Sequence, residues 1–89
     1  MVLQMVAVFD SAAEFFGRPF FTPAVGYATR GFMDEVNRAD RNNELYQHPE
    51  DFTFYHLGSF DDSVGVFQIF EHPIVLVRGK DVVKSVSEE

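Results

Sequence analysis

The sequence has no cysteine and no tryptophan among its 89 residues, and only 7 basic side chains stand against 14 acidic ones. Without cysteine there is no disulfide framework, no cysteine-ligated zinc site and no thiol nucleophile. A net charge of −7 argues against a protein that binds nucleic acid mainly by neutralising phosphates. No apolar run approaches the ~18–20 residues of a membrane helix, and the first residues lack the basic start of a signal peptide. We therefore expect a soluble cytoplasmic protein that contacts no membrane.

Aromatic side chains are the abundant class, with 11 Phe and 3 Tyr. This content is too high for a disordered chain, and the length suits one domain rather than two. The order of the apolar patterns predicts a small single α+β domain over residues 1–79. Its sheet is largely antiparallel, and one main helix packs on one face. Residues 80–89 are expected to form a charged tail that frays or carries a weak final turn.

Apolar periodicity predicts the main elements. Residues 1–10 are apolar on both sides of the pleat, which is typical of a central strand. Ala28, Phe32 and Val36 recur at four-residue spacing and predict the main helix over residues 26–38. A β-hairpin is predicted from residues 52–60 and 64–70, with a loop at 61–65. A last strand is predicted over residues 74–78, and it follows a break at His72-Pro73 and ends at Gly79.

Short-range signals predict the connections. Ser11 and Glu14 have the spacing of a capping box and Gly17 that of a helix stop, so residues 12–16 are predicted to form a helical turn. Residues 18–22 lie between two prolines and are expected to be an edge strand or an extended connection. Either Asn42 or Asn43 can cap a short turn through Tyr46, and Pro49 with the two acids after it is typical of a first helical turn.

The histidines offer only a weak metal-site signal. His48, His56 and His72 have acids nearby in the sequence, namely Glu50, Asp51 and Glu71. Asp51 with His56, or His48 with His72, could converge, but no pair has the spacing of a known metal motif. No serine has a nucleophile setting and no glycine cluster could cradle a phosphate. We expect no metal, no cofactor and no catalytic residue, so the protein is not predicted to be an enzyme.

The strand at residues 52–60 is rich in rings on one side. A small domain with one helix covers only one face of its sheet, so some rings must be exposed, covered by the tail or buried against another subunit. Exposed rings can stack on single-stranded bases, and they can equally be core and dimer interface. The even positions are Phe52, Phe54, His56, Gly58 and Phe60, and the odd ones are Thr53, Tyr55, Leu57 and Ser59.

Four of the seven cations lie in the first half of the chain, at Arg18, Arg30, Arg38 and Arg41. Arg38 and Arg41 stand beside Asn42 in a polar cluster whose donors suit phosphate or carboxylate groups. The alternative is that these arginines pair with neighbouring acids, in particular Asp34, Asp40 and Glu44.

Three runs of the chain resemble a known family. They are RGFMDEVNRAD from Arg30, NNELYQHPEDF from Asn42 and YHLGSFDD from Tyr55. They resemble the small nonstructural protein of microviruses, in the gokushovirus-like branch of these single-stranded DNA phages, and the likeness spans about residues 6–72. This family is sometimes equated with the phage C protein, which is linked to the switch toward single-strand synthesis and packaging. The resemblance implies a phage protein of the host cytoplasm.

Two functions are compatible with these observations. The first is a non-enzymatic accessory protein of genome replication and packaging that contacts single-stranded DNA. Its predicted contacts to phosphates and bases are Arg30, Arg38, Arg41, Asn42, Phe52, Phe54 and Tyr55. The second is a homodimeric adaptor with an acidic surface and an aromatic patch, which engages the phage replication initiator, a procapsid or a host factor. A metal-dependent hydrolase is a third, weaker hypothesis.

Overall fold

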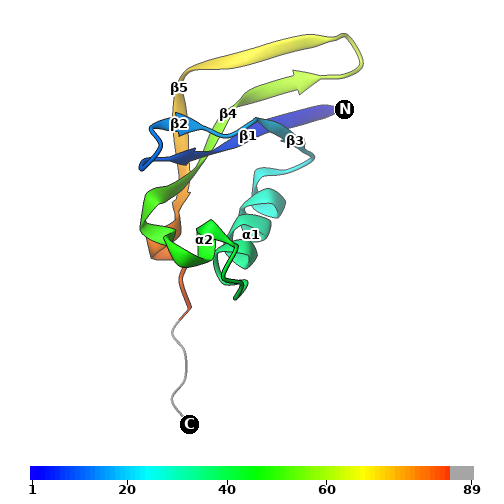
Figure 1. The fold of residues 1–89 in the computed structure, drawn as a ribbon. Helices are drawn as coiled ribbons and strands as arrows, with labels where there is room; N and C mark the ends of the chain where they lie inside the picture. Colours follow the sequence, from blue (N-terminus) through cyan, green and yellow to red (C-terminus); the bar gives the residue numbers. More distant parts are fainter. Residues whose placement is uncertain (85–89) are drawn as a thin grey trace.

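A five-stranded antiparallel sheet carries the helices on one of its sides (Figure 1). The computed structural model describes residues 1–84. Within them, no helix is long and apolar enough to cross a membrane. The predicted α+β class is confirmed. In chain order the elements are β1 Val2–Asp10, β2 Phe15–Phe16, β3 Phe20–Thr22, α1 Val25–Val36, α2 Glu44–Gln47, the 3₁₀ turn η1 Pro49–Asp51, β4 Phe52–Asp61, β5 Val66–Arg78 and the 3₁₀ turn η2 Gly79–Asp81.

Strand β1 is central, as predicted. It pairs with β4 along one side and with both β2 and β3 along the other. Val6 and Ala7 in its middle have no exposed surface, which agrees with its apolar residues on both sides of the pleat. The predicted edge strand is confirmed as β3, which pairs only with β1 among the strands of residues 1–84.

The helical turn predicted for residues 12–16 is wrong. These residues form the loop and second strand of a hairpin, and Phe15–Phe16 is β2. Asp10 takes the capping role that was assigned to Ser11, since its Oδ1 accepts the N–H groups of Ala12 at 3.0 Å and Ala13 at 3.3 Å. Glu14 has a φ of 65°, which ends the turn and directs the chain back along β1. One hydrogen-bonded turn without an apolar stripe to bury has no reason to extend into a helix.

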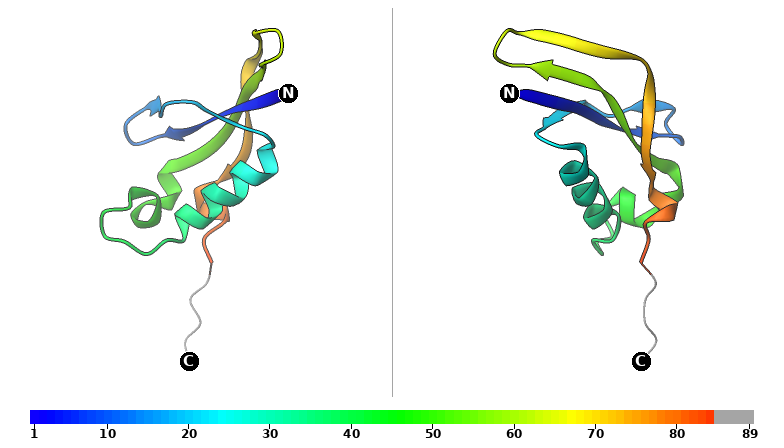
Figure 2. Two further views of the ribbon diagram at one scale, coloured as in Figure 1. Left: turned by 90° about the vertical axis from the view of Figure 1, so that its right-hand side faces the viewer. Right: turned by 180° about the vertical axis from the view of Figure 1, so that it is seen from behind.

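Helix α1 supplies the layer that covers the sheet, and Figure 2 shows it lying across the strands on one side only. Its predicted stripe is confirmed, because Phe32 and Val36 are buried. They pack in one cluster with Val6 of β1 and with Phe52 and Phe54 of β4. The core therefore lies between α1 and the β1–β4 pair.

A single buried side chain connects the end of α1 to α2. Asn43 Oδ1 accepts the N–H of Leu45 and caps α2, as the sequence suggested. Its amide nitrogen donates to the carbonyl oxygens of Glu35 at 2.8 Å and Arg38 at 3.0 Å. Pro49 then opens η1 at the predicted first helical turn.

The hairpin of β4 and β5 is confirmed, including the turn, where Gly65 has a φ of 71°. The break predicted at His72-Pro73 is wrong, because β5 continues as one strand to Arg78. Between the pairs Gly58–Ile69 and His56–Ile74, the single residue Leu57 faces the four residues 70–73. Pro73 has no N–H to give to the ladder, so this stretch bulges and β5 bends sharply there, as Figure 1 shows.

Gly79 ends β5, as predicted, and η2 follows. A Cβ on Gly79 would lie 2.3 Å from the carbonyl oxygen of Pro49, so η2 approaches η1 through this glycine. The first residues of the predicted tail then bond to the end of α1. Asn37 donates to the Val82 carbonyl oxygen at 2.9 Å and accepts the Lys84 N–H at 2.8 Å. The rest of that tail, residues 85–89, lies outside the described residues.

Candidate binding surfaces

The guanidinium of Arg38 is engaged by neighbouring carboxylates. It lies 2.6 Å from Glu35 Oε2 and 2.9 Å from Asp40 Oδ2. The hydrogen bond that Arg38 donates to Glu35, and after it the one to Asp40, raise the pKa of Arg38 further above its usual value. The hydrogen bond from Arg38 in turn lowers the pKa of Glu35. The pairing alternative for this arginine is confirmed, although Glu35 rather than Asp34 is the helical partner.

The other polar residues of the predicted DNA contact remain on the surface. Arg30, Arg41 and Asn42 are exposed. Within residues 1–84, neither Arg30 nor Arg41 has a carboxylate at ion-pair distance. The Asn42 N–H donates to Asp40 Oδ1 at 2.9 Å. These three side chains are therefore accessible to a ligand.

Phe52 and Phe54 do not fit the role of base-stacking residues. They are only 9% and 1% exposed. The ring of Phe54 lies parallel to that of Phe32 at 5.0 Å and stacks on Phe20 at 6.1 Å. The alternation of residues along β4 shows which rings share a side, but it cannot show which side α1 covers. In the fold α1 covers the ring-rich side, so these two rings are core.

Tyr55 lies on the other side of β4, in a cluster with Phe9 and Phe16. Its ring is 5.2 Å from that of Phe16 and 6.3 Å from that of Phe9. The predicted set is therefore divided between the two sides of the sheet and forms no single site. One residue of the predicted set, Arg30, lies beside a different group of aromatic rings.

That group lines a hollow of about 520 Å³ between β3 and α1, which we term the helix-side pocket. Val8, Phe32 and Phe54 of the core contribute to its lining. Its exposed rings are Phe20 and Tyr27, at 46% and 73% exposed, and Phe21 borders it although strand register turns its side chain to the other side of the sheet. The charged side chains that line it are Arg30, Asp34 and Glu35.

The exposure of these rings has a signal in the sequence. Phe20 and Phe21 are consecutive and lie on an edge strand between two prolines, so they point to opposite sides of a short strand. Tyr27 lies off the buried stripe of α1, which is defined by Phe32 and Val36. Apolar rings at such positions are expected to be exposed.

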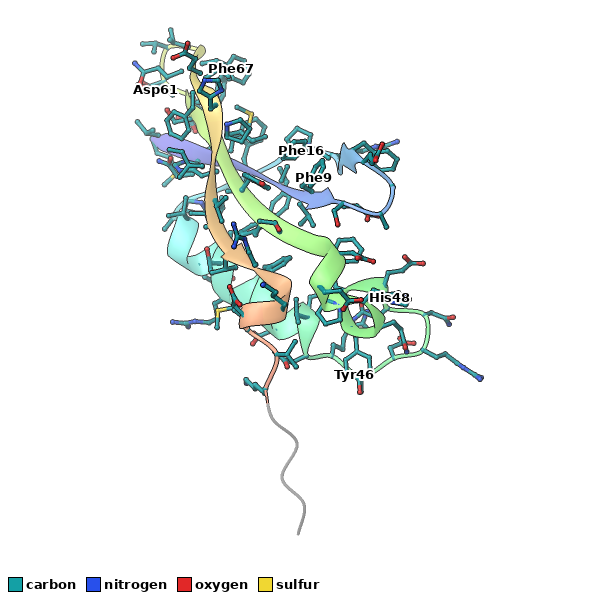
Figure 3. All side chains as sticks on the ribbon, turned by 90° about the vertical axis from the view of Figure 1, so that its left-hand side faces the viewer. Phe9, Phe16, Tyr46, His48, Asp61 and Phe67 are labelled. Atoms are coloured by element: carbon teal, nitrogen blue, oxygen red, sulfur yellow. The ribbon has the colours of Figure 1, made fainter. Side chains whose placement is uncertain are left out.

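The second surface is the side of the sheet turned away from the helices, which we term the open face. Figure 3 looks at the molecule from this side, with β4 and β5 in front of α1 and with Phe9, Phe16 and Phe67 labelled. Strand register places its residues on one side of the sheet, and one of them, Arg78, is charged: Leu3, Met5, Ala7, Phe9, Phe16, Phe21, Thr53, Tyr55, Gly58, Phe60, Phe67, Ile69, Val75 and Arg78.

Rings on the open face gather in two clusters. Phe60 lies 4.6 Å from Phe67 and 5.8 Å from Phe21. The second cluster is that of Phe9, Phe16 and Tyr55, which with Pro73 lines a shallow hollow of about 350 Å³. The open face thus combines large apolar side chains with a concave region.

The metal-site candidates are arranged differently from either predicted pair. His48, Glu50 and Asp51 offer ligand atoms within 4.8 Å of one another, all from one short surface segment. His56 is used in the sheet, where Nε2 lies 2.8 Å from Gln4 Oε1 and the ring meets the edge of Phe70 at 4.7 Å. His48 Nδ1 is 3.9 Å from Glu50 Oε2, and the two groups form an ion pair only when the ring is protonated.

Fold and surfaces together describe a small α+β protein with two largely apolar surfaces. A family model described as "Phage ORF5 protein" matches residues 3–82, and the chain belongs to this family. It is 33% identical over 73 residues to "Protein ORF5" of Chlamydia phage 1, a match that covers 80% of this chain and 76% of that protein. The resemblance to a gokushovirus protein is thereby confirmed. No solved structure is significantly similar.

Proposed function

We propose that this phage accessory protein is non-enzymatic and acts in the replication or packaging of the viral genome. It does so by associating with other proteins through its open face, first of all with a second copy of itself. The observation that supports this proposal is a broad aromatic surface whose strand residues include no carboxylate and one cation, Arg78, in a chain of net charge −7. Exposed apolar patches of this kind most often mark association.

Charge favours a second copy as the occupant. The chain has 14 acidic side chains, and none of those within residues 1–84 lies among the residues of the open face. Two copies that meet at this surface bring none of these carboxylates together, whereas contacts between other parts of two acidic surfaces are opposed by repulsion. A symmetric dimer also requires a self-complementary surface, and a mainly apolar one meets that condition.

The exposed area is close to what a dimer needs. Phe16, Phe21 and Phe67 are 40%, 48% and 54% exposed, and Ile69 and Val75 are 63% and 44% exposed. A fully exposed aromatic side chain presents ~150–250 Å², so these five leave roughly 450 Å² of apolar surface on each copy. Two copies would bury roughly 900 Å² from these residues alone, near the about 1,000 Å² at which specific interfaces begin.

A dimer of this kind leaves α1 and α2 of each copy facing outward. The helix side then remains available to the phage replication initiator, a procapsid or a host factor. The protein works as an adaptor, with one surface for itself and another for a partner.

Sedimentation equilibrium or multi-angle light scattering at tens of micromolar protein tests the proposal. We expect a dimer for the wild type and a monomer for Phe67→Lys, because a lysine there is buried without a partner. Val66→Lys is the matched control, since Val66 is 50% exposed and projects from the other side of the same strand. A monomeric wild type, or equal dissociation by both substitutions, would contradict the proposal, provided that circular dichroism shows both variants folded.

A further inference from the structure

The geometry points to a second site on the opposite side of the sheet: we propose that the helix-side pocket binds a nucleotide, with its base against the exposed rings and its phosphate on Arg30. This goes beyond association through the open face. The ligand has one chemistry, a planar base joined to a phosphate, and two sources, a free nucleotide or a single strand of DNA.

The rings of the pocket suit a flat aromatic ligand. Phe20 and Tyr27 are 46% and 73% exposed and line one hollow of about 520 Å³. This volume falls within the ~300–1,000 Å³ range of small-ligand sites. Phe20 is held in place from below by Phe54, which itself stacks on Phe32. The exposed rings therefore rest on a rigid core, as a stacking platform requires.

The charged groups of the pocket select among apolar ligands. Arg30 has no carboxylate at ion-pair distance within residues 1–84, and Glu35 is already paired with Arg38. Asp34 lies one helical turn after Arg30 on the same wall and also has no ion-pair partner among the described residues. The pocket thus offers one free cation and one free carboxylate beside its rings.

These two charges argue against simpler occupants. A fatty acid would match Arg30, but it would place its apolar tail near the unpaired carboxylate of Asp34. A basic peptide would match Asp34 and be opposed by Arg30. A nucleotide whose base carries an exocyclic amino group satisfies both, because its phosphate accepts from Arg30 and its amino group donates to Asp34.

The number of cations at the pocket determines how strongly binding depends on salt concentration. One arginine at the pocket contacts about one phosphate, so the logarithm of the association constant should fall with the logarithm of salt concentration with a slope of about −0.7. Stacking then carries most of the affinity. This is consistent with a chain of net charge −7, for which a steep salt dependence is not expected.

Fluorescence anisotropy with labelled d(C)12, d(A)12 and d(T)12 on the intact protein tests the assignment, and binding of dCMP followed by NMR forms the second arm. We expect d(C)12 and d(A)12 to bind more tightly than d(T)12. Tyr27→Ala and Arg30→Ala should each lower the affinity about tenfold. Tyr46→Ala and Arg41→Ala are the matched controls, since both residues are exposed and lie outside the pocket. Asp34→Asn should abolish the preference for amino-bearing bases.

Binding of oligonucleotides with the stated slope identifies a single strand as the source, and binding of dCMP without oligonucleotide binding identifies a free nucleotide. Absence of both at 100 μM protein overturns the assignment, as does an equal loss of affinity in the control variants. Phe67→Lys should retain nucleotide binding, because Phe67 lies on the open face. The result of this experiment is therefore separate from the result for dimerisation.

Discussion

The rings of Phe32 in α1 and Phe54 in β4 lie parallel, with centroids 5.0 Å apart and planes 7° apart. This contact joins the helix to the sheet. Phe54 is 1% exposed and also supports Phe20, so one side chain connects α1, β4 and β3. The core and the base of the helix-side pocket consequently share the same ring.

We expect Phe54→Ala to lower the free energy of unfolding by about 3–5 kcal/mol, because it removes a buried ring and leaves a cavity between helix and sheet. Small domains are stable by only ~5–15 kcal/mol, so the variant should be close to unfolded at 37 °C. Urea denaturation followed by circular dichroism measures the loss. Phe67→Ala, at a 54% exposed position, is the control, and it should change the stability of the monomer by less than about 1 kcal/mol. Equal losses in the two variants would show that Phe54 is not a core residue.

Asn43→Ala should cost about 2–3 kcal/mol, since it removes the cap of α2 and both hydrogen bonds from the Asn43 amide, which leaves the Arg38 carbonyl oxygen without this donor and the Glu35 carbonyl oxygen with the Arg38 N–H alone. Asn43 is 5% exposed, so water cannot replace these bonds. Asn42→Ala is the neighbouring control and should stay within about 0.5 kcal/mol of the wild type, because its side chain is exposed. A loss for Asn42→Ala as large as that for Asn43→Ala would contradict the assigned capping role.

Two glycines should respond to alanine with opposite signs. A Cβ on Gly58 would lie 2.3 Å from the carbonyl oxygen of Gln68 and 3.0 Å from the Cα of Ile69, so Gly58→Ala must push β5 away from β4. We expect a loss of about 1–3 kcal/mol. A Cβ on Gly31 in α1 meets nothing within 4 Å, and Gly31→Ala should stabilise the helix by up to about 1 kcal/mol. Thermal unfolding midpoints that shift in the same direction would rule out the close approach at the bulge.

Local periodicity was sufficient for much of this fold. The central strand, the stripe of α1 and the β4–β5 hairpin follow from residues that are neighbours along the chain. The errors occurred where a contact outside the local pattern decided the outcome. Asp10 at the end of β1 caps the turn that Ser11 was expected to cap, and pairing with β4 carries β5 past Pro73. Neither effect is visible in a capping box or in an X-Pro step alone.

The candidate sites were less predictable than the fold, because exposure depends on which side of the sheet α1 covers. The sequence predicted Arg30 as a phosphate contact together with Phe52 and Phe54, which α1 buries. Of the rings that lie near Arg30, Phe20 comes from β3, and only the folded chain brings that strand beside α1. Spatial convergence of this kind has no signature in residue spacing.

The last prediction concerns two carboxyl groups that share one arginine but differ in their response to its removal. The pKa of Glu35 is lowered mainly by its hydrogen bond from Arg38. The pKa of Asp40 is lowered first by the N–H of Asn42 and only second by Arg38. Arg38→Gln should therefore raise the pKa of Glu35 toward its usual value and leave that of Asp40 below its own. A ¹³C NMR titration of the side-chain carboxyl groups measures both values.

The same pKa values set the direction of a pH effect on stability. A carboxyl whose pKa is lower in the folded state than in the unfolded state adds stability above its unfolded pKa, and this contribution disappears as the pH falls through the folded pKa. The wild type should thus lose the contribution of Glu35 as the pH falls through the lowered pKa of this carboxyl, whereas Arg38→Gln should lack it at every pH. Both groups are solvent-exposed, so the effect on the thermal midpoint is expected to be small and to weaken further in high salt.

Arg41→Gln is the control, because Arg41 has no carboxylate at ion-pair distance within residues 1–84. If Arg41→Gln raised the pKa of Glu35 as much as Arg38→Gln does, the lowered pKa would reflect the general field of the basic cluster rather than the hydrogen bond from Arg38.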